Sequence, residues 1–193
     1  MRSVCVFLGS SSGHDPGLRA GAREMGAALA RERLTLVYGG GSVGLMGELA
    51  DAALGGGGEV VGVIPEGLEA KELGHRALTR KHLVRTMHER KAMMADLSDA
   101  FVALPGGMGT LDEFCEVVTW AQLGIHQKPL AMLDLAGYWT PFLGFLDQAV
   151  VAGFVRPEHR AMILVEREPH ALIARMRSWR PPASARWLGR SEV

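Results

Sequence analysis

The chain has 193 residues, of which 48% are hydrophobic and 22% charged, and its 21 basic side chains balance its 21 acidic ones. This length favours one domain with a sizeable core, and a formal charge of zero leaves no global basic field for nucleic acid or an anionic membrane. A small anionic ligand would therefore need a local site. We expect a single domain over residues 1–180 and a mobile tail over 181–193.

Apolar runs alternate with segments of helical periodicity along the chain. Strands are predicted at 4–9, 34–41 (ending in a glycine turn), 59–65, 82–87, 100–105, 128–135 and 161–166; helices are predicted at 18–34, 43–58, 88–98, 109–124, 139–153 and 169–179. Residues 66–81 are polar and weakly patterned, which predicts a loop with about one helical turn. Continuous apolar strands separated by helices indicate a Rossmann-like α/β fold, a doubly wound parallel sheet with helices on both faces.

The cysteines and the apolar runs predict a location. Cys5 lies in the first apolar run and Cys115 in the helix predicted after the glycine-rich segment around residue 107. Two isolated cysteines favour buried thiols in a reducing compartment over a disulfide framework. The first apolar run is too short for a signal peptide, and no run approaches about 18 apolar residues. We therefore expect a cytoplasmic protein without a membrane partner.

Two glycine-rich loops follow predicted strands, at the strand ends where this fold class binds ligands. The first, GGGSVG at 39–44, matches the dinucleotide pattern, but Glu59 opens the next strand where a ribose-binding acid should close it, so NAD is disfavoured. The second, PGGMGT at 105–110, lacks the lysine of a Walker A loop. Its glycines and the helix behind it still suit a phosphate, with Thr110 as the helix cap. The alternative is a tight turn without a ligand.

Glu113 follows the second loop by about one helical turn, roughly 5 Å along the helix axis. From there a carboxylate can reach the sugar of a ribose 5-phosphate, bind its hydroxyls, stabilise positive charge at the anomeric carbon or activate water. Glu113 and Asp112 can equally be acidic residues that favour the positive end of a helix. Composition alone leaves the two interpretations even.

Three motifs in order, GGGSVGLMG, MHERK and PGGMGTLDE, resemble the LOG family, cytokinin-activating phosphoribohydrolases long mislabelled as lysine decarboxylases. The resemblance extends from VFLGSSSG to LDLAGYW. It implies hydrolysis of the N-glycosidic bond of adenosine-type 5′-monophosphates, with or without an N6-prenyl group, to free base and ribose 5-phosphate. It implies neither a metal nor a cofactor, and no pyridoxal phosphate chemistry.

The resemblance also implies site residues. The catalytic pair falls on Arg90 and Glu113. The remaining positions expected at the substrate are Gly106, Gly107, Met108, Gly109, Thr110, Lys91, Glu72, Ser10, Gly41, Gly44 and Met87. Met108 and Glu89 depart from the common pattern and are expected to affect the preference for the base. A homodimer is also implied, with the TWAQLGI segment near the interface.

Two alternatives without catalysis stay open. A nucleotide-binding module would hold an AMP-like ligand and release no base, whereas an interaction protein that kept only the fold would bind no nucleotide. The presence of both Arg90 and Glu113 favours the enzyme over these two classes.

Overall fold

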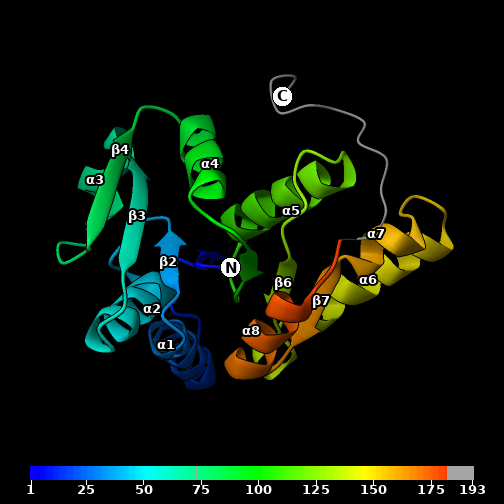
Figure 1. The fold of residues 1–193 in the computed structure, drawn as a ribbon, viewed down its shortest axis with the longest axis horizontal. Coiled ribbons are helices and arrows are strands. Elements are labelled where there is room, and N and C mark those ends of the chain that lie inside the picture. Colours follow the sequence, from blue (N-terminus) through cyan, green and yellow to red (C-terminus); the bar gives the residue numbers. More distant parts are fainter. Residues whose placement is uncertain (73, 182–193) are drawn as a thin grey trace.

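Seven parallel strands form one sheet in the computed structural model, which describes residues 1–72 and 74–181, the side chains of 70–72 excepted (Figure 1). The strands are β1 (Ser3–Phe7), β2 (Thr35–Tyr38), β3 (Val60–Pro65), β4 (Arg80–Val84), β5 (Phe101–Ala103), β6 (Leu130–Leu133) and β7 (Ile163–Glu166). Their order is β4-β3-β2-β1-β5-β6-β7. The chain thus builds the sheet outward from β1 in one direction and then in the other, which confirms the predicted doubly wound class.

Helices connect the strands. They are α1 (Pro16–Arg31), α2 (Gly44–Gly55), α3 (Glu66–Glu72), α4 (Met87–Asp96), α5 (Met108–Gln122), the 3-10 turn η1 (Leu135–Gly137), α6 (Thr140–Val151), α7 (Pro157–Ala161) and α8 (Pro169–Ser178). The segment predicted as a loop contains α3 and the start of β4, and α7 was not predicted. Both helices are too short to display a helical period in the sequence.

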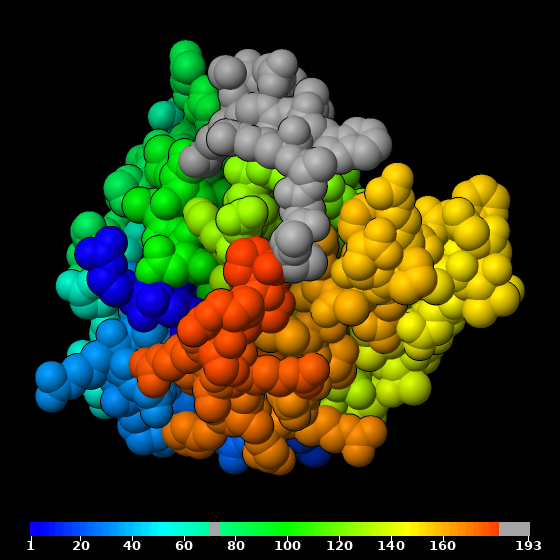
Figure 2. Space-filling model, turned by 45° about the vertical axis from the view of Figure 1, so that its right-hand side comes forward, coloured from blue at the N-terminus to red at the C-terminus, as the bar shows by residue number. Residues whose placement is uncertain are grey.

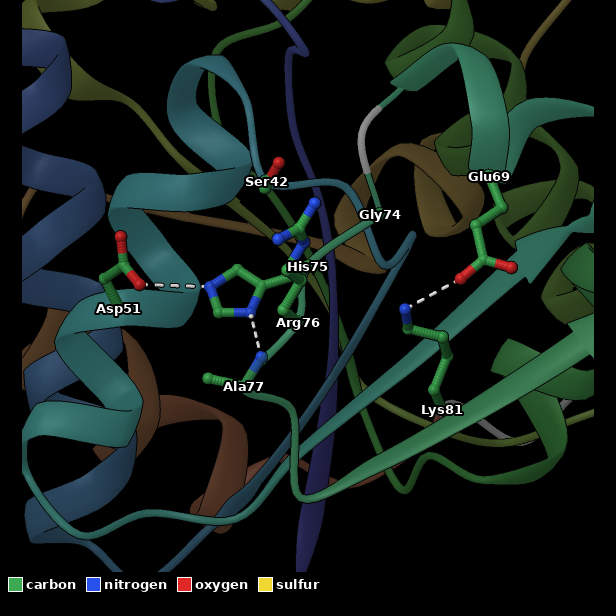
Figure 3. A pocket seen from close by; sticks show the side chains of 8 residues that line it. All are labelled: Ser42, Asp51, Glu69, Gly74, His75, Arg76, Ala77 and Lys81. Carbon is green, nitrogen blue, oxygen red and sulfur yellow. Dashed lines mark hydrogen bonds and ion pairs between the residues drawn. The ribbon is translucent and has the colours of Figure 1, made fainter.

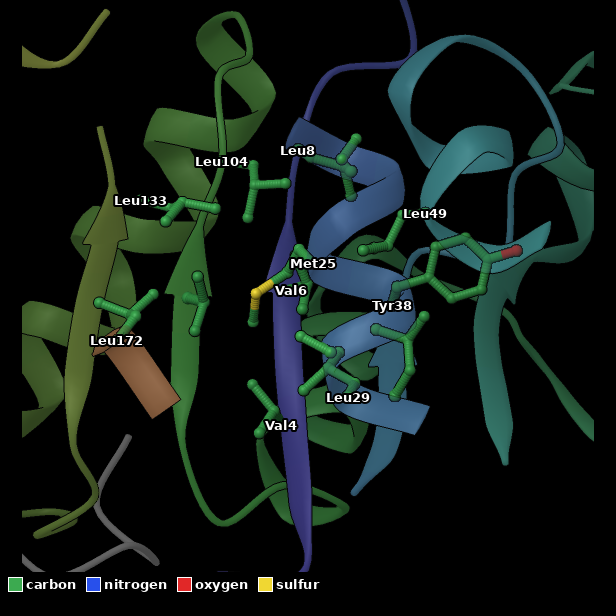
Figure 4. Close-up of a cluster of buried hydrophobic side chains, with 14 of the residues drawn as sticks. Val4, Val6, Leu8, Met25, Leu29, Tyr38, Leu49, Leu104, Leu133 and Leu172 are labelled. Atoms are coloured by element: carbon green, nitrogen blue, oxygen red, sulfur yellow. The ribbon is translucent and has the colours of Figure 1, made fainter. Parts of the chain in front are cut away.

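Two apolar layers enclose the sheet. On one face, α1, α2 and α8 bury Met25, Leu49 and Leu172 against inward-facing residues such as Val4 and Val6 (Figure 4). On the other face, α4 and α5 cover a second cluster. Strands buried on both faces need apolar side chains at successive positions, which explains the unbroken apolar runs in the sequence.

The cysteines do not share one environment. Cys5 is buried in β1 as predicted, but Cys115 is exposed on α5, which corrects the expectation of two buried thiols. Its helical neighbour Phe114 takes the inward direction instead. Within the described residues, no helix combines the length and apolarity that crossing a membrane requires. The predicted tail lies outside the described residues, except for Pro181.

His126, in the connection between α5 and β6, is held in its neutral form. Its Nε2 lies 2.8 Å from the carbonyl oxygen of Val117, and its Nδ1 accepts a hydrogen bond from the backbone N–H of Lys128 at 3.1 Å. A proton on Nδ1 would oppose that N–H. Burial lowers the pKa of His126 to about 4; the Lys128 charge acts in the same direction, and the hydrogen bond to Val117 acts against them.

We predict that His126→Gln makes stability less sensitive to acid. Well above pH 6.5 the ring is neutral in both states and contributes nothing. As the pH falls through 6.5 the unfolded chain takes up a proton that the folded chain does not take up until about pH 4. The wild-type free energy of unfolding should therefore lose roughly 2 kcal/mol between pH 7 and pH 5 through this residue alone. Urea unfolding at the two pH values measures the loss. The exposed His88→Gln is the control, and an unchanged pH dependence in His126→Gln would contradict the prediction.

Candidate functional site

Three loops meet at the carboxyl ends of β1, β2 and β5, where the strand order reverses. The backbone N–H of Gly9 donates to the carbonyl of Pro105 at 3.1 Å. A β-carbon on Gly106 would lie 2.8 Å from the Gly9 nitrogen, and one on Gly44, which has a φ of +61°, would lie 2.2 Å from the Ser10 oxygen. The loops therefore rest backbone to backbone, and only glycine permits the approach at residues 44 and 106. The predicted residues Ser10, Gly44 and Gly106 are brought together here.

The second glycine loop opens into α5. The helix begins at Met108, and Gly107 occupies the cap position without a side-chain hydrogen bond. Thr110 was predicted to cap this helix, but the structure shows it as a buried residue of the first turn. Gly107 and Gly109 face open space. The first N–H groups of α5 have no partner within the helix, as at the start of any helix.

Arg90 of α4 is buried under the first glycine loop, with 8% of its surface exposed. Its Nε donates to the carbonyl of Val63 at 3.2 Å and its Nη2 to that of Gly39 at 3.5 Å. A β-carbon on Gly39 would lie 2.0 Å from Nη2. Residue 39 must therefore lack a side chain for the guanidinium to occupy this position at the ends of β2 and β3.

Glu113 of α5 faces Arg90. Its Oε1 lies 3.6 Å from Arg90 Nη2, and about a tenth of each side chain is exposed. Thr110 and Glu113, three residues apart on α5, are both buried on one helix face, so the glycine loop and the carboxylate are parts of one rigid element. The structure thus brings together the pair that the MHERK and PGGMGTLDE motifs predicted.

Met87 and Lys91 flank Arg90 on α4 but differ in what they contact. The sulfur of Met87 lies 3.8 Å from Arg90 Nη1, and Met87 is 40% exposed, so it borders the pair. Lys91 Nζ instead lies 3.0 Å from Glu116 Oε1 and 3.3 Å from Asp112 Oδ2. Burial acts to lower the pKa of Lys91, but its bonds to these carboxylates outweigh burial and raise it. Lys91 joins α4 to α5.

Glu89, which was predicted to affect the preference for the base, forms hydrogen bonds at the start of α4. Thr86 caps the helix by accepting from the Glu89 N–H at 3.1 Å, and the Glu89 carboxylate accepts from the backbone N–H of Arg85 at 2.9 Å. Met108 is 81% exposed at the start of α5. Glu72 is the last residue of α3, and its side chain lies outside the described residues.

A cavity of about 690 Å³ borders the first glycine loop, and its lining includes the polar residues Ser42, His75 and Lys81 (Figure 3). His75 is buried, with Nε2 3.0 Å from Asp51 Oδ1, while its backbone N–H donates to the carbonyl of Gly40 at 2.9 Å. Gly41, predicted at the substrate, pairs with Gly74 in an isolated antiparallel bridge. Residues 74–75 thus hold the loop that covers Arg90.

Sequence reasoning missed three residues that shape the site: Gly39, His75 and Tyr138, whose hydroxyl donates to the carbonyl of Gly106 at 2.6 Å. The GGG run that ends β2 was a local signal for Gly39. The other two act through contacts with residues far along the chain, for which a single sequence gives no signal. Within the described part of the chain, no three His, Cys, Asp or Glu residues are grouped so that they could hold a metal ion.

A family model, relatives in sequence and solved structures are similar to this chain. A family model described as "Possible lysine decarboxylase" matches residues 46–176. A probable cytokinin riboside 5′-monophosphate phosphoribohydrolase of Oryza sativa subsp. japonica is 49% identical over 180 residues, 93% of this chain and 79% of that protein. The cytokinin riboside 5′-monophosphate phosphoribohydrolase of Rhodococcoides fascians is 49% identical over 178 residues, 92% and 90% of the two chains. A solved molybdenum cofactor carrier protein of Chlamydomonas reinhardtii is 22% identical with a TM-score of 0.67, covering 91% and 95%; this likeness concerns the fold alone.

We predict that Lys91→Met lowers stability by about 1–2 kcal/mol, because Glu116 and Asp112 then lose their shared cation at a site where the lysine side chain is only 11% exposed. Urea unfolding at neutral pH measures the change. Arg85→Met is the matched control, since the pair of Arg85 with Glu89 is exposed and should contribute less than half as much. Equal losses in the two variants would show that Lys91 does not hold the helices together.

Proposed function

The chain belongs to the LOG family, whose model has the older description of a possible lysine decarboxylase, and we propose that it is a nucleoside 5′-monophosphate phosphoribohydrolase. It hydrolyses the N-glycosidic bond of an adenosine-type nucleotide to free base and ribose 5-phosphate. Relatives 49% identical to it are named for this reaction on cytokinin ribosides. The observation that carries the proposal is the buried Arg90–Glu113 pair directly behind the open start of α5.

The substrate phosphate binds at the start of α5 in this proposal. The backbone N–H groups of the first turn donate to its oxygens, and the positive end of the helix dipole favours its charge. The exposed Gly107 and Gly109 let the phosphate approach the backbone closely. The ribose then extends along α5 toward Glu113, about one helical turn away.

Glu113 acts at the anomeric carbon. The bond from C1′ to the base nitrogen breaks, its electron pair leaves with the base, and positive charge develops on the sugar, which the carboxylate stabilises. Water then adds to C1′ and gives a proton to Glu113, from which the proton passes to the departing base. The products together contain the atoms of the substrate and one water.

Arg90 explains why an acid can lie beside a phosphate site. Its guanidinium faces Glu113 at 3.6 Å and compensates the carboxylate charge where little water reaches either group. The planar group donates to the carbonyls of Val63 and Gly39 through Nε and Nη2, and its Nη2 also forms the ion pair with Glu113. A lysine has no such planar fork and would not replace it.

We predict that Glu113→Gln lowers kcat with AMP by a factor on the order of 10² to 10⁴, because the amide can neither accept the proton nor stabilise the cation. Arg90→Lys should also lower kcat, since the fork that orients Glu113 is lost. Chromatography of released adenine measures both rates. Glu24→Gln, at an exposed position of α1, is the control and should keep wild-type turnover; near-normal turnover in Glu113→Gln would rule out the assignment.

The base is to be identified by comparing AMP with isopentenyladenosine 5′-monophosphate. The exposed Met87 and Met108 offer apolar surface at the site, which supports a prenylated base. We expect faster release of the prenylated base at equal, sub-saturating concentrations. Comparable rates would indicate a broader AMP nucleosidase, and tight AMP binding with no release would indicate the nucleotide-binding module instead.

We further propose that residues 1–180 form one domain that works in the cytoplasm as a homodimer, on a small nucleotide and not on nucleic acid. The apolar helix α6 has no buried residue. Its Phe145 and Val151, and Phe154 after it, are 62%, 90% and 88% exposed. Figure 2 shows α6 and the following residues, in yellow, projecting from one side of the molecule. Exposed apolar residues gathered in this way favour an interface.

We predict that the double substitution Phe145→Glu and Phe154→Glu converts the dimer to a monomer, because charges on both faces of the interface repel and lose solvation. Light scattering after size exclusion gives the mass of each form. Ala20→Glu, at an exposed position of α1, is the control and should stay dimeric. A wild-type chain that is monomeric at tens of micromolar would overturn this part of the proposal.

A further inference from the structure

Tyr138 contacts the second glycine loop from the connection that follows β6. It follows η1, between β6 and α6, and its hydroxyl donates a hydrogen bond to the carbonyl oxygen of Gly106 at 2.6 Å. The tyrosine is 43% exposed, and its ring meets that of Trp139 edge-on at 5.0 Å between centroids. Its hydroxyl is thus bonded to the loop, while its ring packs against Trp139.

The connection that carries Tyr138 is fixed by its own contacts. Asp134, which is 4% exposed, accepts from the backbone N–H of Trp139 at 2.7 Å. Ala136 and Gly137 both have positive φ, +52° and +74°. For alanine this backbone conformation is unfavourable, so surrounding contacts must hold it. Leu135 supplies one of them, since its side chain fills the space that a β-carbon on Gly21 of α1 would occupy.

The hydrogen bond to Gly106 determines the orientation of a whole peptide group, not of its carbonyl alone. In a trans peptide the C=O and the following N–H point in opposite directions, and no cis peptide is present among the described residues. Holding the Gly106 oxygen toward Tyr138 therefore turns the N–H of Gly107 away from the tyrosine. A hydrogen bond to a carbonyl also strengthens the N–H of the same peptide as a donor.

We propose that Tyr138 is a positioning residue for the phosphate site: it keeps the Gly106 carbonyl away from the anion and presents the Gly107 N–H to it. Gly107 is the cap residue of α5, and the hydrogen bond from Tyr138 acts on the carbonyl of the peptide that joins Gly106 to it. Without the hydroxyl, the glycine peptide is free to rotate its oxygen toward the phosphate, where it would repel it. This inference rests on the phosphate site of the proposed function.

The test compares Tyr138→Phe, which removes only the hydroxyl, with Tyr138→Ala, which removes the ring as well. Calorimetry measures binding of ribose 5-phosphate, AMP and adenosine to each variant, and base release from AMP gives KM and kcat. For Tyr138→Phe we expect ribose 5-phosphate and AMP to bind roughly 5- to 30-fold more weakly, the effect of one hydrogen bond. Affinity for adenosine should be unchanged, and KM should rise more than kcat falls.

Each outcome separates this inference from the proposed function. If AMP binding weakens selectively in Tyr138→Phe but no variant releases base, Tyr138 has its role and the hydrolase assignment is wrong. If wild-type protein releases base and Tyr138→Phe matches it for AMP and ribose 5-phosphate, the inference is wrong. A defect found only in Tyr138→Ala, equal for adenosine and AMP, would mean that the ring merely packs; failure of wild-type protein to bind either phosphate compound would overturn both.

Discussion

Arg90 occupies the space that a side chain on residue 39 would fill, and the candidate site depends on this constraint. The guanidinium lies under the glycine loop after β2 and is held by carbonyl oxygens at the ends of β2 and β3. From there it reaches Glu113 on α5, which follows β5 on the other side of β1. The ion pair therefore spans the point where the sheet changes its direction of growth. If the loop binds phosphate as we propose, the carboxylate can lie behind it because a buried guanidinium faces the carboxylate.

The loops at this point are held by contacts with one another and with neighbouring segments of the chain. Gly44 admits the backbone of Ser10, and Gly106 lies against Gly9. His75 reaches the first loop from beyond β3, and Tyr138 reaches the second from beyond β6. Glycine loops are flexible in isolation, and contacts from neighbouring elements are what allow such loops to present their N–H groups in one direction.

The fold and the chemistry are separable in this protein. A molybdenum cofactor carrier protein 22% identical to it has a similar fold, so the architecture alone does not decide between binding and catalysis. The proposed reaction depends instead on α4 and α5 being held in register. Lys91, between Glu116 and Asp112, links the same two helices one residue beyond Arg90.

The sequence by itself determined the strands and the longer helices, because apolar runs and helical periods are local signals. It also placed both glycine loops at strand ends where the fold binds ligands. Its motifs also identified Arg90 and Glu113 as a pair. Tertiary structure decided what depends on contacts between distant residues: the bond from Tyr138 to Gly106, 32 residues away, the space at Gly39 for an arginine 51 residues later, and the partners of Lys91. It also decided that Thr110 is buried in the first turn and that Cys115 is exposed, since a side chain's direction on a helix is fixed only when that helix packs.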